Sequence, residues 1–475
     1  MKLKKLIHQI EGLKVYGSCD IEISGLCAHS KFVAPHQLFI AKKGGMYSEE
    51  AIASGAIAVL TDLYDPFLKV TQLVHPEVDK IQAQLAARYY DFPSEHLKVV
   101  GVTGTNGKTT STFLIKHLLD YAGLEAGLMG TVEWIIKDNH YKAHLTTADV
   151  ITNHKWLREM WLSGCKTAVM EVSSHGLDQE RVGEIAFEVA LFTNLTPEHL
   201  DYHKDMASYA KAKEKLFTGL KSSNWAILNA DSEFRPQTSA QILTYGIDRQ
   251  ADLRAENIEL GKKKSRFIVC YAGQKKLCIS PLIGRYNVYN LLGAMGVCLA
   301  MGLSLDMCLE SLATFKQVRG RLERVKNALG IEIIVDFAHT EDALLRVLTT
   351  LNEVKEGRLI TVFGCGGDRD SLKRPKMGAV ATKLSHLTII TSDNPRTEDP
   401  QKIADEIAKG ASSDANYLIE LDRKLAIQKA IQAAQKGDIV LIAGRGHEQE
   451  QVFAHQVVPF DDVQVARLLC QEALV

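Results

Sequence analysis

The chain has 475 residues, 46% of them hydrophobic and 24% charged, and its formal net charge is −1. The length predicts about three domains, and the composition is typical of a globular protein. A net charge near zero argues against nucleic acid as a partner, and no apolar run reaches the roughly 20 residues that a membrane-spanning helix needs.

The cysteines and the N-terminal residues indicate the cellular compartment of the protein. The nine cysteines show no paired metal-type spacing, and Glu11 and Lys14 interrupt the apolar residues near the N-terminus. Free thiols are typical of a reducing compartment, and a signal peptide needs an uninterrupted apolar core. We therefore expect a cytoplasmic protein without an integral membrane segment. Cys365 lies near a candidate site, and we interpret it as a packing residue.

Predicted strands and helices alternate along the chain, a pattern typical of parallel sheets covered by helices on both faces. The first unit contains a helix-to-strand pattern at residues 51–62 and a helix that Pro93 ends. The clearest later strands are predicted in the segments 97–104, 167–174, 188–195, 224–231, 331–340, 358–370, 387–396 and 438–448. We therefore predict an α/β fold in three units, residues 1–97, 98–317 and 318–475.

A glycine-rich turn at residues 101–110, GVTGTNGKTT, lies between a predicted strand and a helical pattern. Its glycines let backbone N–H groups face a phosphate, Lys108 can reach the terminal phosphates, and Thr109 can coordinate Mg²⁺. Val102 stands where the strict P-loop pattern has glycine, and a turn that binds no nucleotide is the alternative. The strand–turn–helix context favours ATP and Mg²⁺. The predicted ATP-binding residues of the turn are Gly104, Thr105, Asn106, Gly107, Lys108, Thr109 and Thr110.

Two further stretches of this unit carry metal-ligand chemistry. Glu171 ends a predicted strand, where its carboxylate can hold Mg²⁺ beside Thr109. His199, Asp201 and His203 follow at close spacing. A zinc site is conceivable there, although no second cluster of ligand-type residues completes it. We favour His199 as a partner of the phosphates or of Mg²⁺.

Lys213 lies within YAKAKEKLF, residues 209–217. On a helix it shares a face with Tyr209, Leu216 and Phe217. A lysine on an apolar face must find a partner, lower its pKa or be chemically altered. The alternative is a buried stem with the ammonium in water. Periodicity does not decide between these.

Four predicted strands of the third unit end in a polar or glycine-rich cluster: DFAHT, GCGGDRD, SDNPR and GRGHE. Pro395 cannot continue a central strand, so the chain leaves the sheet there, with Asp393, Asn394 and Arg396 beside it. A solvated turn is the alternative for one such loop. Because ligands of open α/β sheets bind outside the carboxyl ends of the strands, four clusters on one edge indicate a binding pocket.

Taken together, these stretches resemble the Mur ligase family, the ATP-dependent amide ligases of peptidoglycan precursor synthesis. The segments GTNGKTT, EVSSHGLDQERV, NLTPEHLDYH, YAKAKEKLF, GRYNVYN, GRLE, DFAHT and GRGHE occur in the order of the family. The resemblance covers the whole chain. Within the family, SSHGLDQERV, GCGGDRD and DNPR are similar to the ligases that add a diamino acid to UDP-N-acetylmuramoyl-L-alanyl-D-glutamate.

The resemblance implies a UDP-binding domain at 1–97, a central P-loop ATPase domain with a parallel sheet at 98–317, and a Rossmann-like, amino-acid-binding domain at 318–475. It implies that Lys213 is carried as a carbamate that helps to hold a second Mg²⁺. The implied catalytic residues are Lys108, Lys213, His199 and His339. The implied metal-side residues are Thr109, Glu171, His199 and the Lys213 carbamate.

The resemblance also implies substrate contacts. Further nucleotide contacts would be Asn290, Arg321, Asp336 and His339. Contacts to the UDP-muramoyl dipeptide would be Ser30, Thr146, Thr147, Ser173, Gln179 and Arg181. Contacts to meso-diaminopimelate would be Arg369, Asp393, Asn394, Arg396, Gly444 and Glu448. These substrates are small molecules, and the sequence identifies no protein partner.

The DNPR loop carries an expectation about amino-acid selectivity. Diaminopimelate ends in an ammonium and a carboxylate on one carbon, whereas lysine ends in an ammonium alone. Arg396 can meet a carboxylate with two parallel hydrogen bonds, and Pro395 stiffens the loop. Gly444 and Glu448 can receive the ammonium. We therefore expect the loop to select diaminopimelate over lysine.

Some positions depart from the family pattern. His29, Ser30 and Lys31 stand where relatives read Asp-Ser-Arg near the uridine site, and the segment 42–56 is several residues shorter. Leu145 replaces an asparagine before the paired threonines, and Arg445 replaces the more usual lysine. Folylpolyglutamate synthetase, which shares the fold and the P-loop, is the rival enzyme. A nucleotide-binding scaffold without catalysis is the rival of another class.

Overall fold

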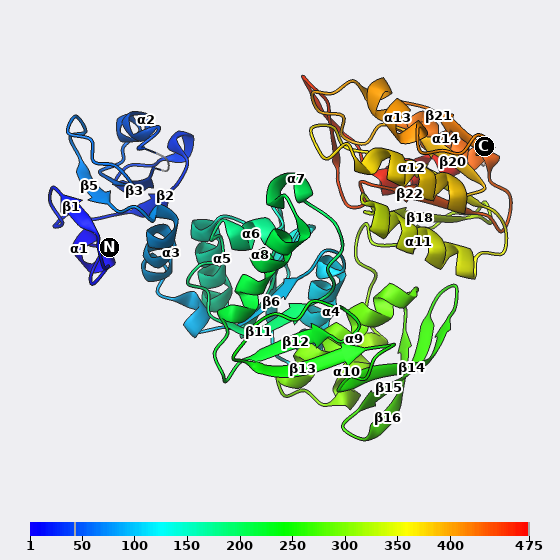
Figure 1. The fold of residues 1–475 in the computed structure, drawn as a ribbon, viewed down its shortest axis with the longest axis horizontal. Coiled ribbons are helices and arrows are strands. Elements are labelled where there is room, and N and C mark those ends of the chain that lie inside the picture. Colours follow the sequence, from blue (N-terminus) through cyan, green and yellow to red (C-terminus); the bar gives the residue numbers. More distant parts are fainter. Residues whose placement is uncertain (42–43, 474–475) are drawn as a thin grey trace.

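The computed structural model describes residues 1–41 and 44–473, and three large sheets organise them (Figure 1). Each sheet is built from one continuous stretch of chain, so the three follow one another in sequence and in space. Lys42 and Lys43, at the start of the shortened segment, lie outside the described residues. No helix in the described part of the chain combines the length and apolarity that crossing a bilayer requires.

The first sheet has five strands in the order β1-β5-β4-β3-β2, parallel except for β1. The strands are β1 (Lys14–Tyr16), β2 (Gly25–Cys27), β3 (Gln37–Ile40), β4 (Ala58–Thr61) and β5 (Thr71–Val74). The helical elements are α1 (Leu3–Leu6), η1 (Ser30–Phe32), α2 (Ser48–Ala53), α3 (Val78–Tyr89) and η2 (Pro93–Glu95). The expected helix-to-strand pattern forms α2 and β4, and α3 ends before Pro93, as expected.

The second sheet has eleven strands in the order β16-β15-β14-β13-β12-β11-β6-β10-β7-β8-β9. The strands are β6 (Lys98–Thr103), β7 (Ala126–Met129), β8 (Glu133–Ile136), β9 (Asn139–Lys142), β10 (Thr167–Glu171), β11 (Phe187–Phe192), β12 (Trp225–Asn229), β13 (Gln241–Gly246), β14 (Leu253–Leu260), β15 (Ser265–Tyr271) and β16 (Gln274–Ser280). The strands that lie from β14 through β6 to β7 in this order, namely β14, β13, β12, β11, β6, β10 and β7, run parallel, as expected. Antiparallel hairpins extend both edges, which the sequence did not indicate.

Helices cover both faces of the second sheet's parallel centre (Figure 1). They are α4 (Lys108–Tyr121), α5 (Val150–Leu162), α6 (Ser174–Asp178), α7 (Leu200–His203), α8 (Met206–Thr218), α9 (Arg285–Ala300) and α10 (Leu305–Leu312). One apolar core contains residues of α4, α9 and α10, and a second on the other face contains residues of α5, α6 and α8. Val150 and Ile151 of α5 belong to the core of the first sheet, which joins these two units.

The third sheet has six strands in the order β17-β18-β22-β19-β20-β21, parallel except for β17. The strands are β17 (Glu323–Val325), β18 (Glu332–Asp336), β19 (Leu359–Phe363), β20 (Leu387–Ile390), β21 (Tyr417–Ile419) and β22 (Ile439–Ala443), and a separate hairpin comprises β23 (Glu450–Val452) and β24 (Val457–Pro459). The helices are α11 (Glu341–Val354), α12 (Lys373–Leu384), α13 (Pro400–Ala408), α14 (Arg423–Ala433) and α15 (Asp462–Glu472). The parallel registers bring the four polar clusters to one edge of the sheet.

Candidate active site

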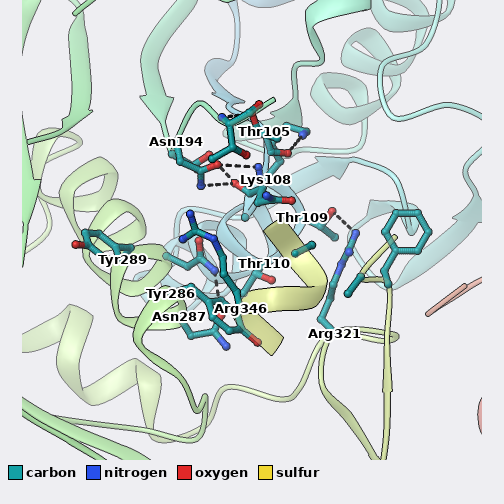
Figure 2. A pocket seen from close by; sticks show the side chains of 18 of the residues that line it. Thr105, Lys108, Thr109, Thr110, Asn194, Tyr286, Asn287, Tyr289, Arg321 and Arg346 are labelled. Atoms are coloured by element: carbon teal, nitrogen blue, oxygen red, sulfur yellow. Dashed lines mark hydrogen bonds between the residues drawn. The ribbon is translucent and has the colours of Figure 1, made fainter. Parts of the chain in front are cut away.

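A cavity of about 600 Å³ lies where the second unit meets the third (Figure 2). Its walls come from the glycine-rich turn before α4, the loop after β11, the first turns of α9, the loop after β18 and the start of α11. Many residues predicted from the sequence line it. They are Thr105, Asn106, Gly107, Lys108, Thr109, Thr110, Thr146, Glu171, Ser173, His199, Asn290, Arg321, Asp336 and His339.

The glycine-rich turn has the predicted strand–turn–helix geometry. Val102 is a buried residue of β6, so the turn itself begins at Gly104. A Cβ at Gly104 would lie 1.9 Å from the hydroxyl of Thr193, which explains the glycine there. Gly107 has φ of 88° and leads into α4 without a side-chain cap, so no cap takes up the first N–H groups of the helix. The Lys108 ammonium donates hydrogen bonds to the backbone oxygens of Gly104 (2.9 Å) and Thr105 (2.7 Å).

Thr109 and Glu171 lie together at the base of the cavity. The Thr109 hydroxyl donates to Oε2 of Glu171 at 3.1 Å and accepts from Nη2 of Arg321 at 2.9 Å. The backbone N–H and the hydroxyl of Thr131 also donate to the Glu171 carboxylate, at 2.8 and 3.0 Å. The hydroxyl of Thr109 and the carboxylate of Glu171 thus offer oxygen ligands beside the first turn of α4, and oxygen ligands suit Mg²⁺.

The carboxylate of Glu198 lies between two imidazoles, and sequence reasoning missed it. Its oxygens are 3.7 Å from Nε2 of His199 and 3.7 Å from Nε2 of His339. Burial opposes ionisation of this carboxyl, but the histidines and Lys108 outweigh burial and hold its pKa well below the usual range. Burial lowers the pKa of His199 to about 4. The only sequence signal was that Glu198 directly precedes His199.

His203 and Asp201, the other members of the conceivable zinc cluster, do not point to one site. Asp201 is exposed, whereas His203 is buried against the ring of Tyr209. In the described part of the chain, no three His, Cys, Asp or Glu side chains are grouped as ligands of one metal ion.

Lys213 is 1% exposed on the apolar face of α8. Its ammonium lies 4.4 Å from the centre of the Tyr209 ring and donates a 3.0 Å hydrogen bond to the backbone oxygen of Gly104. Burial, followed by the charge of Lys108, places the pKa of Lys213 well below the ordinary lysine value. The side chain therefore reaches the phosphate turn from the side away from the cavity. The alternative of a buried stem with its ammonium in water is wrong.

The remaining predicted nucleotide contacts also surround the cavity. Asn290 on α9 fits closely against the turn, since a Cβ at Gly107 would lie 2.4 Å from its side-chain oxygen. The Asp336 carboxylate accepts from the backbone N–H groups of Leu322 (2.7 Å) and Ala338 (2.8 Å). Burial raises the pKa of Asp336.

An unpredicted contact joins the two units directly. Asp342 of α11 accepts from the side chain of Asn106 in the phosphate turn at 2.8 Å and from Nε of Arg346 at 2.9 Å. Arg346 points into the cavity beside the turn (Figure 2). Neither residue belongs to a motif noticed in the sequence, because their partners lie on the other unit.

Five of the six residues expected at the UDP-muramoyl dipeptide are linked by hydrogen bonds. Thr147 accepts at its hydroxyl from the N–H of Ser173 (2.9 Å) and at its backbone oxygen from Arg181 (2.9 Å). Arg181 also donates to Gln179 at 2.7 Å, and Thr146 is tied through Thr131 to Glu171. Ser30 is buried at the start of η1 in the first unit, apart from this group.

The six residues expected at diaminopimelate lie at the carboxyl ends of β19, β20 and β22 and in the loops that follow, and none lines the 600 Å³ cavity. Asp393 and Asn394 are buried, so the solvated-turn alternative for this loop is wrong. Asn394 donates to Oε2 of Glu448 at 2.7 Å, and a Cβ at Gly444 would lie 2.6 Å from Oδ2 of Asp393. Arg396 donates to the backbone oxygen of Gly367 at 2.7 Å.

Arg369 is exposed beside this group, and Cys365 packs behind it. The Cys365 sulfur lies 3.7 Å from the sulfur of Met377, and burial raises the pKa of its thiol to about 12. This confirms its interpretation as a packing residue. All nine cysteines are free.

Comparison with known proteins agrees with this geometry. Residues 102–298 match the Mur ligase middle domain, and residues 320–446 match the Mur ligase glutamate ligase domain. A UDP-N-acetylmuramoyl-L-alanyl-D-glutamate–2,6-diaminopimelate ligase of Chlamydia pneumoniae is 43% identical over 98% of both chains. The enzyme of the same name numbered 1 in Clostridium acetobutylicum is 38% identical over 99% of this chain and 100% of its own.

A solved structure of a UDP-N-acetylmuramoyl-L-alanyl-D-glutamate–2,6-diaminopimelate ligase is similar along the whole length. It superposes with a TM-score of 0.70 at 31% identity, covering 100% of this chain and 99% of that one. The matches span the units that build the cavity as well as the first sheet. The chain therefore belongs to the Mur ligase family.

Proposed function

We propose that this protein is the ATP-dependent ligase that adds meso-diaminopimelate to UDP-N-acetylmuramoyl-L-alanyl-D-glutamate in peptidoglycan precursor synthesis. One observation supports this above all: a single cavity joins the phosphate turn, with Lys108, to Thr146 and Ser173 of the expected dipeptide site. A ligase needs the nucleotide and the acceptor carboxylate in one enclosure.

ATP fits the turn because the start of α4 offers unpaired N–H groups and Lys108 offers an ammonium. Mg²⁺ fits the oxygens of Thr109 and Glu171, and a carbamate on Lys213 would add a further anionic oxygen group. Mg²⁺ takes few protein oxygens and keeps several waters, so a small donor set suffices. When bound, Mg²⁺ supplies neutralisation of the charge on the transferring phosphoryl group.

The proposed chemistry proceeds in two steps. The γ-carboxylate of the substrate glutamate attacks the γ-phosphorus of ATP, the bridging P–O bond breaks, and ADP leaves. The amine then attacks the carbonyl carbon of the acyl phosphate and loses a proton, and inorganic phosphate leaves as the amide forms. Lys108 stabilises the transferring group, and closure of the third unit over the cavity excludes water from the reactive anhydride.

Charged side chains of the third unit favour a diamino acid with a terminal carboxylate as the amino-acid substrate. Arg396 and Arg369 form no ion pair with a carboxylate anywhere in the described part of the chain, and both approach Gly366. A guanidinium without an anionic partner beside the acceptors Glu448 and Asp393 matches a head that carries a carboxylate and an ammonium. Lysine has no carboxylate at the end of its side chain and would leave the guanidinium of Arg396 without an anionic partner.

We further propose that residues 1–97 bind the UDP end, 98–317 bind ATP, and 318–475 bind the amino acid. A cytoplasmic location fits nine free cysteines and the cytoplasmic supply of ATP. Small molecules are the proposed partners, and nucleic acid is not among them.

Release of phosphate tests the proposal. Purified protein is given ATP, Mg²⁺ and the UDP-linked dipeptide, with diaminopimelate, with lysine or without an amino acid. We expect rapid release only with diaminopimelate and a UDP-linked tripeptide as product. Release that requires a folate instead would identify the protein as a folylpolyglutamate synthetase, and no release with any amino acid would identify a scaffold.

A further inference from the structure

Arg445 is completely buried beneath the DNPR loop. Its Nη1 donates to Oδ1 of Asn394 at 3.0 Å, and its Nη2 donates to the backbone oxygens of Glu450 (2.9 Å) and Phe460 (3.1 Å). Within the described residues it forms no ion pair with a carboxylate, and its Nε has no partner. The Phe460 ring also faces the guanidinium, and the carboxylates of Asp462, Asp393 and Glu448 favour its charge without bonding to it. A buried cation whose hydrogen bonds go only to neutral oxygens is still costly to keep, so its contacts call for a reason beyond packing.

The contacts of Asn394 determine which way its amide points. Oδ1 accepts from Arg445 and from the backbone N–H of Val452 at 2.9 Å, and both of these groups can only donate. On the other side, Nδ2 faces Oε2 of Glu448 at 2.7 Å, which accepts. Flipping the amide would set its nitrogen against two donors and its oxygen against a carboxylate. The orientation is therefore set by the network.

This orientation has a consequence for recognition. Both lone pairs of the Asn394 oxygen are used behind the loop, so the side chain can offer only N–H donors to a ligand. One N–H is held by Glu448, and the second is available for a carboxylate. Glu448 lies beside it as an acceptor for an ammonium. Asn394 and Glu448 together therefore offer a donor for the carboxylate and an acceptor for the ammonium of an amino-acid head.

We propose that Arg445 is a positioning residue that holds the Asn394 amide with its N–H groups toward the amino-acid site, and so sets the selectivity for a carboxylate-bearing head. The inference rests on the proposed function, because it assumes that this loop binds the amino acid. Gln451 supports the same arrangement, since its side chain donates to the backbone oxygen of Asp393 at 2.7 Å.

The test compares Arg445→Met, Arg445→Lys and Asn394→Ala with the wild-type enzyme. We expect Arg445→Met to raise the KM for diaminopimelate about tenfold or more, with the KM for ATP and for the UDP-linked dipeptide unchanged. Arg445→Lys keeps a donor within reach of Asn394 and is expected to restore most of the affinity. In the Asn394→Ala background, Arg445→Met should add little further effect, because residues that act through one contact are not additive.

Arg358→Met is the matched control. Arg358 is an arginine at the opposite end of the same sheet, paired with the buried Asp438 at 2.7 Å. Its loss should lower the melting temperature while leaving the KM for diaminopimelate unchanged. If Arg445→Met behaves in the same way, Arg445 is only structural and the inference is overturned.

Asn394→Asp tests the donor role without touching Arg445, in case the Arg445→Met protein does not fold. The carboxylate can still accept from Arg445 and Val452 but can no longer donate, so the KM for diaminopimelate should rise steeply while the KM for ATP stays unchanged. An unchanged KM overturns the inference alone. A wild-type protein that neither binds diaminopimelate in calorimetry nor ligates it overturns the proposed function, and the inference with it.

Discussion

The ammonium of Lys213 donates a 3.0 Å hydrogen bond to the backbone oxygen of Gly104. A helix residue thus reaches the phosphate turn from the protein interior, where no water can stabilise its charge. Lys108 donates to the same oxygen at 2.9 Å, so two lysines converge on one carbonyl. Burial, and then the nearby charge of Lys108, lower the pKa of Lys213 and so favour its neutral amine, the form that can add CO₂.

Lys213 is predicted to be carbamylated. Lys213→Ala should lower the rate of phosphate release on the order of 100-fold or more, because an anionic oxygen ligand is lost at the metal side. Short carboxylic acids should restore part of it. Lys211→Ala, which removes an exposed lysine of the same helix, is the control. NMR with ¹³C-bicarbonate that shows no carbamate signal, together with full activity of Lys213→Ala, would contradict the prediction.

Lys108 is predicted to serve the terminal phosphates of ATP. Lys108→Ala should reduce diaminopimelate-dependent phosphate release about 10²- to 10³-fold, because a preorganised cation at the transferring group is lost. The melting temperature without nucleotide should stay close to that of the wild type, since the ammonium bonds only to its own turn. Normal turnover by this variant would place the nucleotide elsewhere.

Glu198 is predicted to orient His199 and His339, one from each unit. Glu198→Gln keeps the size but removes the charge between the two imidazoles, and should lower kcat about 10- to 100-fold, as loss of an orienting carboxylate does. The exposed Asp201, replaced by Asn, is the control. A kcat equal to that of the wild type would show that the carboxylate only fills space.

Arg396 is predicted to discriminate diaminopimelate from lysine. Arg396→Ala should cut kcat/KM for diaminopimelate roughly 100-fold or more, because the half-buried guanidinium can no longer form paired hydrogen bonds with the terminal carboxylate. The value for lysine, which lacks that carboxylate, should change little. Arg467→Ala, at an exposed arginine of α15, should change neither value. A wild-type enzyme that ligates lysine as efficiently as diaminopimelate would refute this role of the loop.

His154 is predicted to destabilise the fold in mild acid. Burial lowers its pKa from 6.5 to about 4, and its Nε2 lies 3.0 Å from the backbone oxygen of Gly183. The unfolded chain therefore binds a proton between pH 6.5 and 4 that the folded chain does not, so stability falls as the pH is lowered through this window. The loss should be at most about 3 kcal/mol.

Urea unfolding at several pH values measures this effect. His154→Gln can keep a donor for Gly183 without titrating, so its stability should change less between pH 7 and pH 5 than that of the wild type. His8→Gln, at an exposed histidine, is the control. Identical pH dependence in the wild type and His154→Gln would contradict the prediction.

Local patterns in the sequence were enough to predict much of the fold. The strand, turn and helix around Lys108 follow from glycine spacing and apolar periodicity, which act within about ten residues. The position of Lys213 on the apolar face of its helix follows from helical periodicity in the same way, whereas the burial of its ammonium does not. The four strand-end clusters of the third unit follow from the rule that parallel strands share a carboxyl edge, and the registers of β18, β19, β20 and β22 agree with it.

Only the tertiary structure decided which distant residues meet. The contact of Glu198 with His339 and that of Asn106 with Asp342 cross between two sheets, and neither partner carries a local signal of the other. Arg445 lies beneath Asn394 because β22 and β20 flank β19 in the sheet order. The sequence pattern also did not predict the antiparallel hairpins at both edges of the second sheet. Such contacts depend on the order of strands and the packing of units, which the periodicity of a short segment does not encode.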